Sequence, residues 1–278
     1  MQSRRKSGFP LTSRMALCFF LLTDFGLSDP YVGQMKAAIR SRVPEAGFLD
    51  LSHGVRPHNI VQAAFFLASS WPYLPRGSTG LAVVDPGVGT SRSILLLRQD
   101  ERSVLAPDNG LIGLLLDSRP GCRVWRMRPP LKDQEVSATF HGRDVFAPLA
   151  CQLAQGEDPS LLGEPMDPAI CWNTPGSRPH LEGNRVQAGV VHVDRFGNCV
   201  LNLKSEQWAG SFPAGRPIKL VHPRRETIRS VSTYALIPNA RVGLLAGSQG
   251  YLELACNQRS CAQHLGLDIG DECILSLG

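Results

Sequence analysis

The sequence predicts an α/β protein in two parts: an N-terminal α/β domain with a mostly parallel central sheet, and a smaller C-terminal all-β, barrel-like domain. In the first half, apolar runs typical of buried strands alternate with helical patterns. Beyond residue 185, short strand-like runs follow one another between turn residues, with almost no helical periodicity. The length of 278 residues suits one large domain or two smaller ones, at about 150 residues per domain.

The N-terminal domain is expected to begin with a buried strand and a capped helix. Asp29 is a good helix cap and Pro30 a good first helical residue, while Pro44 would end that helix. The expected strands are Leu17–Leu22, Phe48–Leu51, Leu81–Val84, Ile94–Leu97 and Val104–Ala106. The further expected helices are Asn59–Trp71, Leu111–Leu116 and Val145–Leu153.

The second part of the chain is expected to contain strands only. They are Val186–Val193, Val200–Leu203, Ile218–Val221, Val242–Leu245, Tyr251–Ala255 and Cys273–Leu277. A stretch rich in proline and glycine precedes them and has no periodicity, which is typical of a linker. The predicted division is a basic disordered leader at 1–14, the α/β domain at 15–170, a linker at 171–185 and the β domain at 186–278.

The charge distribution argues against a nucleic-acid partner. The net charge is 29 − 24 = +5, and residues 1–14 hold four basic residues and no acid, so the remainder is nearly neutral. A nucleic-acid-binding fold needs a basic stripe, and none is visible. The apolar run Met15–Leu22 follows a basic segment like a signal peptide, but it lacks a small-residue cleavage site and is too short to span a bilayer. We therefore expect no membrane partner.

The eight cysteines form neither a zinc pattern nor a dense disulfide framework. The closest pair is Cys256 and Cys261, and no two cysteines have the CxxC spacing. Several lie in apolar runs, where buried free thiols are common. A reducing, cytoplasmic location is the natural expectation.

Polar residues at strand ends are the first candidates for a functional site. Asp24 follows the first strand, at the edge where ligands bind in open α/β sheets, and its carboxylate could accept from both hydroxyls of a ribose. A turn or helix cap is the alternative. Asp85 and Arg92 flank a sharp loop with two glycines, so both could face one pocket, or they could form a structural salt bridge.

Three further segments combine turn residues with chemically useful side chains. His141 stands beside a glycine at a helix entrance, and could be exposed for chemistry or serve a structural purpose. The segments Asp194–Asn198 and Gly247–Tyr251 interrupt strands. Each is typical of a hairpin turn, and its polar groups could also face a cleft between the two domains, where ligand sites are common.

Taken together, these segments give the chain a family resemblance. It resembles the S-adenosyl-L-methionine (SAM) hydroxide adenosyltransferases, the adenosine-forming SAM hydrolases, which are related to fluorinases and chlorinases. The resemblance runs from about residue 21 to 277. Its motifs occur in the family's order: Thr23–Gly26, Leu51–His53, Val84–Thr90, Ala106–Gly110, Phe140–Asp144, Asp194–Asn198 and Gly250–Glu253.

The resemblance implies a homotrimer that binds SAM between one subunit's N-terminal domain and a neighbour's C-terminal domain. SAM is the substrate, adenosine and L-methionine are the products, and no cofactor or metal is implied. The family's catalytic triad falls on Asp85, Arg92 and His141. The expected substrate-binding residues, with Asp24 at the ribose, are Asp24, Asp29, Asp194, Phe196, Asn198, Tyr234 and Ser248.

The chain departs from the halogenase relatives at several positions. Gln249 stands where they have an arginine that holds the substrate carboxylate, and His58 stands where fluorinases have a tryptophan. His141 and Gly142 replace the polar groups of the halide pocket, and no spare segment is visible for the halogenases' extra loop, which favours hydrolysis. A halogenase and a non-catalytic SAM or adenosine sensor are the alternatives.

The reaction expected of this family is an in-line attack of water at C5′ of SAM. The sulfonium departs as a neutral thioether, so no acid is needed at sulfur. Arg92 and His141 would hold the water and Asp85 would orient Arg92. Either His141 or the Arg92–Asp85 pair could take the proton.

Overall fold

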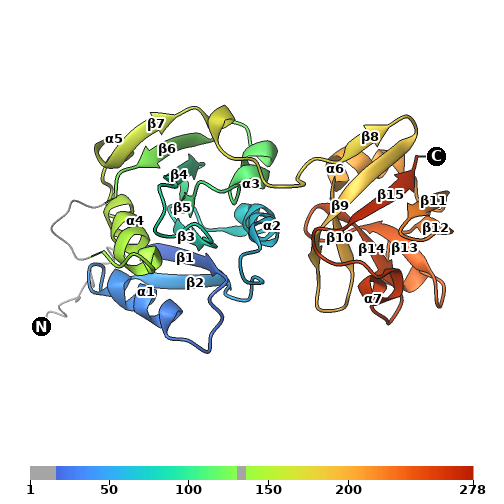
Figure 1. Ribbon diagram of the computed structural model, residues 1–278, viewed down its shortest axis with the longest axis horizontal. Coiled ribbons are helices and arrows are strands. Elements are labelled where there is room, and N and C mark those ends of the chain that lie inside the picture. Colours follow the sequence, from blue (N-terminus) through green and yellow to red (C-terminus); the bar gives the residue numbers. More distant parts are fainter. Residues whose placement is uncertain (1–16, 130–135, 278) are drawn as a thin grey trace, which may run out of the picture.

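The computed structural model describes residues 17–129 and 136–277, and the expected leader at 1–14 lies outside them. An α/β unit and a β-barrel stand side by side, joined by an extended segment of chain (Figure 1). The predicted mixed α/β class is confirmed.

The N-terminal sheet has seven strands in the order β2-β1-β3-β5-β4-β6-β7. The neighbours β2, β1, β3 and β5 are parallel, and the pairings of β4, β6 and β7 are antiparallel. The inner parallel strands β1 and β3 are covered on both faces, which explains why their sequences are continuous apolar runs. The strands are β1 (Cys18–Thr23), β2 (Gly47–Ser52), β3 (Thr79–Val83), β4 (Ile94–Gln99), β5 (Arg102–Pro107), β6 (Arg123–Met127) and β7 (Gly163–Met166).

Helices cover both faces of this sheet (Figure 1). On one face lie α1 (Tyr31–Arg40) and α4 (Ala147–Ala154), packed on a core that contains Phe19 and Leu81. On the other lie α2 (Ile60–Ser70) and α3 (Gly113–Ser118). Their core includes Phe20 and also reaches Val191, Val200 and Tyr251 of the barrel. A short helix, α5 (Pro159–Leu162), precedes β7.

Two expected helix starts are wrong in detail. Asp29 does not cap α1: Pro30 occupies the cap position, its carbonyl accepts from Gln34 N at 2.9 Å, and no side chain completes the cap. The helix therefore begins one residue later than the Asp-Pro signal predicts, although Pro30 itself has helical backbone angles. The predicted helix Val145–Leu153 begins inside a π-helical turn at Gly142–Phe146, which continues into α4.

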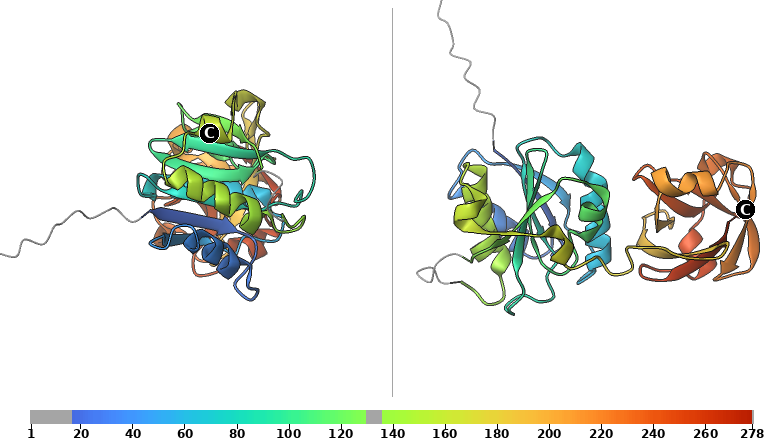
Figure 2. Two further views of the ribbon diagram at one scale, coloured as in Figure 1. Left: turned by 90° about the vertical axis from the view of Figure 1, so that its left-hand side faces the viewer. Right: turned by 90° about the horizontal axis from the view of Figure 1, so that it is seen from above.

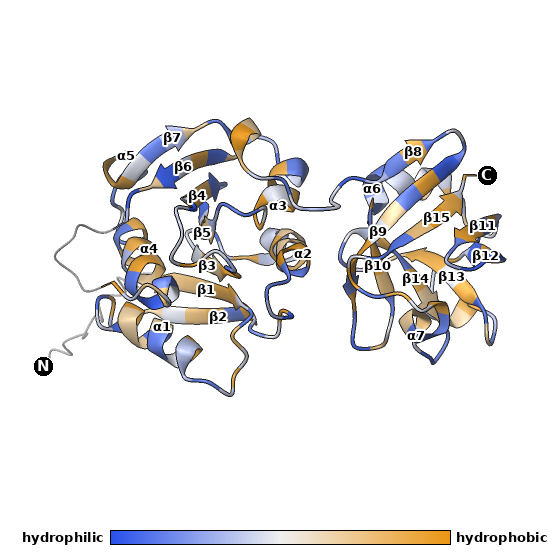
Figure 3. Cartoon of the chain, in the orientation of Figure 1, coloured by the Kyte–Doolittle hydropathy of each residue, from blue (hydrophilic) through white to orange (hydrophobic). Residues whose placement is uncertain are grey.

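The second unit is a closed seven-strand barrel, which confirms the barrel-like prediction. The pairing of β9 with β10 closes it, and β8 lies outside beside β9. In Figure 3 orange apolar residues follow its strands, in keeping with one packed interior. The strands are β8 (His180–Glu182), within the expected linker, and β9 (Arg185–Val193), β10 (Cys199–Lys204), β11 (Pro217–His222), β12 (Glu226–Ser230), β13 (Val242–Ala246), β14 (Tyr251–Cys256) and β15 (Glu272–Ser276). Two short helices not expected from the sequence accompany them, α6 (Ser205–Trp208) and α7 (Cys261–Leu265).

Helix α2 joins the two units by packing against the barrel strand β9 (Figure 2). The Phe65 ring stacks on the imidazole of His192 with ring centres 5.5 Å apart, and Gln62 Nε2 lies 3.0 Å from His192 Nδ1. Burial lowers the pKa of His192. At the rim, Arg56 Nη1 lies 2.7 Å from Asp268 Oδ1.

The cysteines are free thiols, as expected, and six of the eight are buried. Over the described ranges 17–129 and 136–277, no helix has both the length and the apolar character needed to cross a membrane.

Candidate active site

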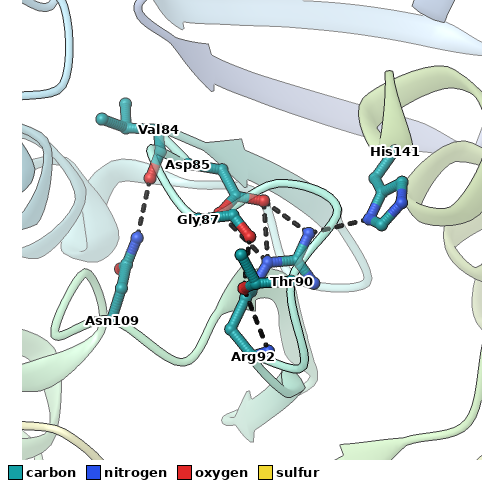
Figure 4. A network of polar contacts seen from close by, with 7 residues as sticks. All are labelled: Val84, Asp85, Gly87, Thr90, Arg92, Asn109 and His141. Atoms are coloured by element: carbon teal, nitrogen blue, oxygen red, sulfur yellow. Dashed lines mark hydrogen bonds and ion pairs between the residues drawn. The ribbon is translucent and has the colours of Figure 1, made fainter. Parts of the chain in front are cut away.

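The loop after β3 is built to bring Asp85 and Arg92 together. It turns sharply at Gly89, whose backbone φ of +80° favours glycine and whose missing Cβ would lie 2.7 Å from the carbonyl oxygen of Ala138. Thr90 Oγ1 donates to the carbonyl of Gly87 at 2.7 Å. The chain therefore reverses direction tightly, and the two charged side chains meet across it (Figure 4).

The Arg92 guanidinium lies against the Asp85 carboxylate in a fork. Nε donates to Oδ1 at 3.0 Å and to Oδ2 at 2.9 Å, while Nη2 donates to Oδ2 at 2.5 Å. The side chains are only 11% and 5% exposed. Such a bidentate, shielded pair has a fixed orientation, unlike an exposed salt bridge between two flexible side chains.

His141 completes the array from a distant part of the chain. Nη2 of Arg92 lies 3.0 Å from His141 Nδ1 (Figure 4). His141 occupies the residue before the π-helical turn, a kind of irregularity found often at functional sites. Burial, and then the charge of Arg92, lower the pKa of His141. The imidazole is therefore neutral at pH 7, and its Nδ1 accepts from the guanidinium.

Asp24, Asp85 and His141 line one pocket of about 310 Å³. They come from the loops after β1 and β3 and from the turn before α4. Aromatic side chains that the sequence analysis did not single out form one wall: the Tyr31 and Phe140 rings are 5.2 Å apart, and Phe25 lies within 5.9 Å of both. The pocket thus combines polar groups on one side with a rigid apolar surface.

Asp24 is held in place by a backbone group. Its Oδ2 accepts from the amide of His58 at 2.8 Å, and His58 has a left-handed φ of 65°. The His58 side chain also lines the pocket. Asp29 is exposed and outside the pocket lining, so the structure does not bring it to Asp24.

The structure of one chain does not bring the predicted barrel residues into this pocket. Asp194 forms a turn in which Oδ1 accepts from the amides of Phe196 and Asn198 at 2.9 and 2.8 Å, and Oδ2 accepts from Asn198 Nδ2. Asn198 is buried, whereas Phe196 is 78% exposed and unpaired with any aromatic ring of the described residues. The turn presents an apolar ring to its surroundings.

Tyr234 and Ser248 also belong to the barrel, and Tyr234 is near the Asp194 turn: burial, then Glu253 and the charge of Asp194, raise the pKa of its hydroxyl. The Tyr234 hydroxyl donates to Glu253, a buried side chain whose pKa is raised by that burial. Ser248 and Gln249 line a separate pocket of about 260 Å³ beside Lys204. Burial lowers the pKa of Lys204. Over the described residues, no cluster of three or more His, Cys, Asp or Glu side chains is arranged to hold a metal ion.

Comparison with known proteins places the chain among named relatives. The chain is 36% identical over 259 residues to an (R)-S-adenosyl-L-methionine hydrolase from Thermus thermophilus, covering 90% of this chain and 96% of the relative. An enzyme of the same name from Salinispora tropica is 33% identical over 92% of this chain and 96% of its own length. A fluorinase from Nocardia brasiliensis is more distant, at 22% identity over 90% and 93%.

A solved structure and two family models also match this chain over most of its length. A crystal structure of a conserved protein from Thermotoga maritima superposes with a TM-score of 0.83 at 28% identity, covering 94% of this chain and all of that one. Residues 19–163 match the SAM hydroxide adenosyltransferase N-terminal domain, and residues 188–274 match the C-terminal domain of the same name. On these matches, which span most of its length, the chain belongs to the SAM hydroxide adenosyltransferase family.

Proposed function

We propose that this protein hydrolyses S-adenosyl-L-methionine to adenosine and L-methionine at the pocket lined by Asp24, Asp85 and His141. The observation that carries the proposal is the Asp85–Arg92–His141 array, in which Asp85 and His141 line the same pocket as Asp24. Arg92 joins them from behind and lines a neighbouring pocket with His141. The names of the relatives that are more than 30% identical support hydrolysis over halogenation, because the fluorinases are more distant.

The array suits the activation of one water molecule. Asp85 fixes the Arg92 guanidinium, which in turn fixes the imidazole of His141. A water that accepts hydrogen bonds from Arg92 and His141 would be aimed at C5′ once Asp24 binds the ribose. Placing the water oxygen in line with C5′ lowers the entropic part of the barrier by roughly several kcal/mol. No acid is needed at the sulfur, because it leaves as a neutral thioether.

The hydrogen bonds favour Asp85 as the proton acceptor. When water attacks C5′, the C5′–S bond breaks, its electron pair stays on sulfur, and the new hydroxyl loses one proton. Because His141 Nδ1 accepts from Arg92, its own proton lies on Nε2, and this neutral ring has no free lone pair for another proton. The Asp85 carboxylate keeps lone pairs beyond those used by Arg92.

We further propose a homotrimer in the cytoplasm, with each site completed by a neighbour's barrel. The pocket lining contains no barrel residue, while Phe196 and Tyr234 are exposed on the barrel at 78% and 45%. A neighbouring subunit that placed these rings over the pocket would cover both the substrate and the apolar surface. The free thiols of the chain suit a reducing compartment.

The experiment is an incubation of the purified protein with SAM, with and without chloride or fluoride, followed by chromatography of the nucleosides. Wild type, Asp85→Asn and the exposed control Glu45→Ala are run side by side. We expect equal amounts of adenosine and methionine and one proton per turnover in wild type and the control, and almost none in Asp85→Asn.

Other outcomes would contradict the proposal in distinct ways. A 5′-halonucleoside that forms only with halide would assign a halogenase. Tight binding of SAM without turnover would assign a sensor. Sedimentation of the wild type as a monomer at the assay concentration would contradict the proposed trimer.

A further inference from the structure

A second polar array lies behind Asp24 and has no part in the proposed reaction. It consists of Thr23, His53 and Asp50, at the ends of the neighbouring parallel strands β1 and β2. Thr23 Oγ1 lies 2.8 Å from His53 Nδ1, and His53 Nε2 lies 3.2 Å from Asp50 Oδ1, off the line of a hydrogen bond. Asp50 is also bonded to Lys36 at 2.6 Å.

Thr23, His53 and Asp50 are arranged like the nucleophile, base and acid of a catalytic triad. They cannot reach a substrate, because the first two are buried. Thr23 has no exposed surface, and His53 is only 6% exposed. Thr23 Oγ1 also accepts from the amide of Phe25 at 3.3 Å, which ties the hydroxyl into the turn. A buried hydroxyl and a buried imidazole at this spot therefore serve position rather than chemistry.

Apart from the approach of Nε2 to Asp50, the contacts of His53 lead to the turn that carries Asp24. Its side chain bonds to Thr23, the residue before Asp24, and its backbone carbonyl accepts from Gly26 N at 2.8 Å. The third tie between the two loops is the bond from His58 N to Asp24 itself. His53 thus supplies two of these three ties, one on each side of Asp24.

We propose that His53 is a positioning residue that fixes the Asp24 carboxylate for the ribose diol of the substrate. This inference rests on the proposed function, in which Asp24 binds the ribose. An aspartate on a short turn has two free side-chain torsions and a movable backbone. The hydrogen bond between His53 and Thr23 fixes the backbone next to Asp24. Less conformational entropy is then lost when the Asp24 carboxylate binds the two ribose hydroxyls.

The test uses two nucleosides that the enzyme does not consume. Adenosine has the ribose diol, and 2′,3′-dideoxyadenosine lacks it, so the ratio of their dissociation constants measures the hold on the diol. Calorimetry on wild type should give tighter binding of adenosine by on the order of tenfold to a hundredfold, as for hydrogen bonds to a charged group. Asp24→Asn calibrates the loss of that ratio.

Three variants at position 53 and one control separate positioning from general damage. His53→Ala removes the Thr23 bond. His53→Asn places an amide oxygen near the position of Nδ1 and keeps that bond, whereas His53→Gln reaches toward Asp50 and loses it. Ser52→Ala is the matched control, because Ser52 Oγ accepts only from Gly54 N among the described residues, at 3.0 Å.

We expect the adenosine preference to fall below about threefold in His53→Ala and His53→Gln, and to persist in His53→Asn and Ser52→Ala. KM for SAM should rise in the same two variants with a smaller change in kcat, and His53→Ala should add little in an Asp24→Asn background. If His53→Ala does not fold, the contrast between Asn and Gln decides.

Equal weakening of both nucleosides would overturn the inference, as would an unchanged preference in both His53→Ala and His53→Gln. These failures differ from a failure of the proposed function. In that case, wild type itself would show no preference for adenosine, or no hydrolysis of SAM.

Discussion

Arg92 and Asp85, seven positions apart in the sequence, form a bidentate pair across a turn, with Nε and Nη2 both donating to the carboxylate. The pair is shielded from water, and its remaining face is turned to His141. A salt bridge that only closed the turn would need no third partner. The contact with the imidazole therefore links the loop to the pocket and makes the geometry of Arg92 testable.

Replacing Arg92 by lysine should lower turnover more than binding. Lysine keeps the positive charge but cannot donate to Asp85 and His141 at once from a planar fork. We expect kcat to fall on the order of a hundredfold, as when a preorganised donor is removed, with KM nearly unchanged. Steady-state kinetics measure this, and Arg128→Lys, in an exposed pair with Glu164, is the control. A change in KM alone would contradict the role.

The pH dependence should follow the neutral state of His141. Burial and the charge of Arg92 hold the pKa of His141 below the ordinary 6.5. The imidazole therefore stays neutral as the pH falls through 6.5. Below the lowered pKa the protonated ring can no longer accept from Arg92, and kcat should drop. His141 also lowers the stability of the fold as the pH falls below 6.5, because its imidazole binds a proton more readily in the unfolded chain than in the folded one. A fall in kcat that is complete above pH 6.5 would contradict this assignment.

Asp24 should act mainly on binding. In Asp24→Asn the His58 amide keeps an acceptor, but the ribose loses a charged partner. We expect KM for SAM to rise about tenfold or more, with a smaller loss of kcat. The kinetic constants of Asp24→Asn and Arg92→Lys should therefore separate. Equal effects of both on KM alone would show that this division of roles is wrong.

Gly80 should stabilise the N-terminal sheet by leaving room for a neighbouring ring. A Cβ at this residue of β3 would lie 2.0 Å from the Phe20 ring on the neighbouring strand. Gly80→Ala should lower the free energy of unfolding by about 1–3 kcal/mol, measured by thermal denaturation. Gly33→Ala is the matched control, because it lies in helix α1 with nothing within 4 Å of its Cβ. That change should be neutral or stabilising by up to about 1 kcal/mol.

The sequence predicts the buried elements well and the exposed ones poorly. Strands β1 and β3 are continuous apolar runs because they are buried on both faces. Strand β6 was missed because two arginines, Arg123 and Arg126, interrupt its few apolar residues, and β12 because Ile228 is its only buried hydrophobic side chain. Edge and surface strands carry little apolar signal, and their pairing depends on the rest of the sheet.

From spacing alone, the candidate site was predictable only where its residues are close in sequence, and Asp24 and His141 joined it through the family resemblance. The spacing of Asp85 and Arg92 around a glycine loop is enough to bring them together. His141 lies 49 residues beyond Arg92, and only the fold joins them. The aromatic wall of Phe25, Tyr31 and Phe140 has no common periodicity, because Phe25 and Phe140 lie in two separate loops and Tyr31 begins helix α1.

The division of the recognition groups between two surfaces has a consequence for mixed assemblies. The pocket at Asp24 has no barrel residue in its lining, while the Asp194 turn with its exposed Phe196 belongs to the barrel. In the proposed trimer, a subunit with a substitution at Asp85 still has an intact barrel, which completes the site of its neighbour. Two inactive variants, one altered at Asp85 and one at Phe196, should therefore regain activity when their subunits are exchanged, through sites that combine the undamaged half of each.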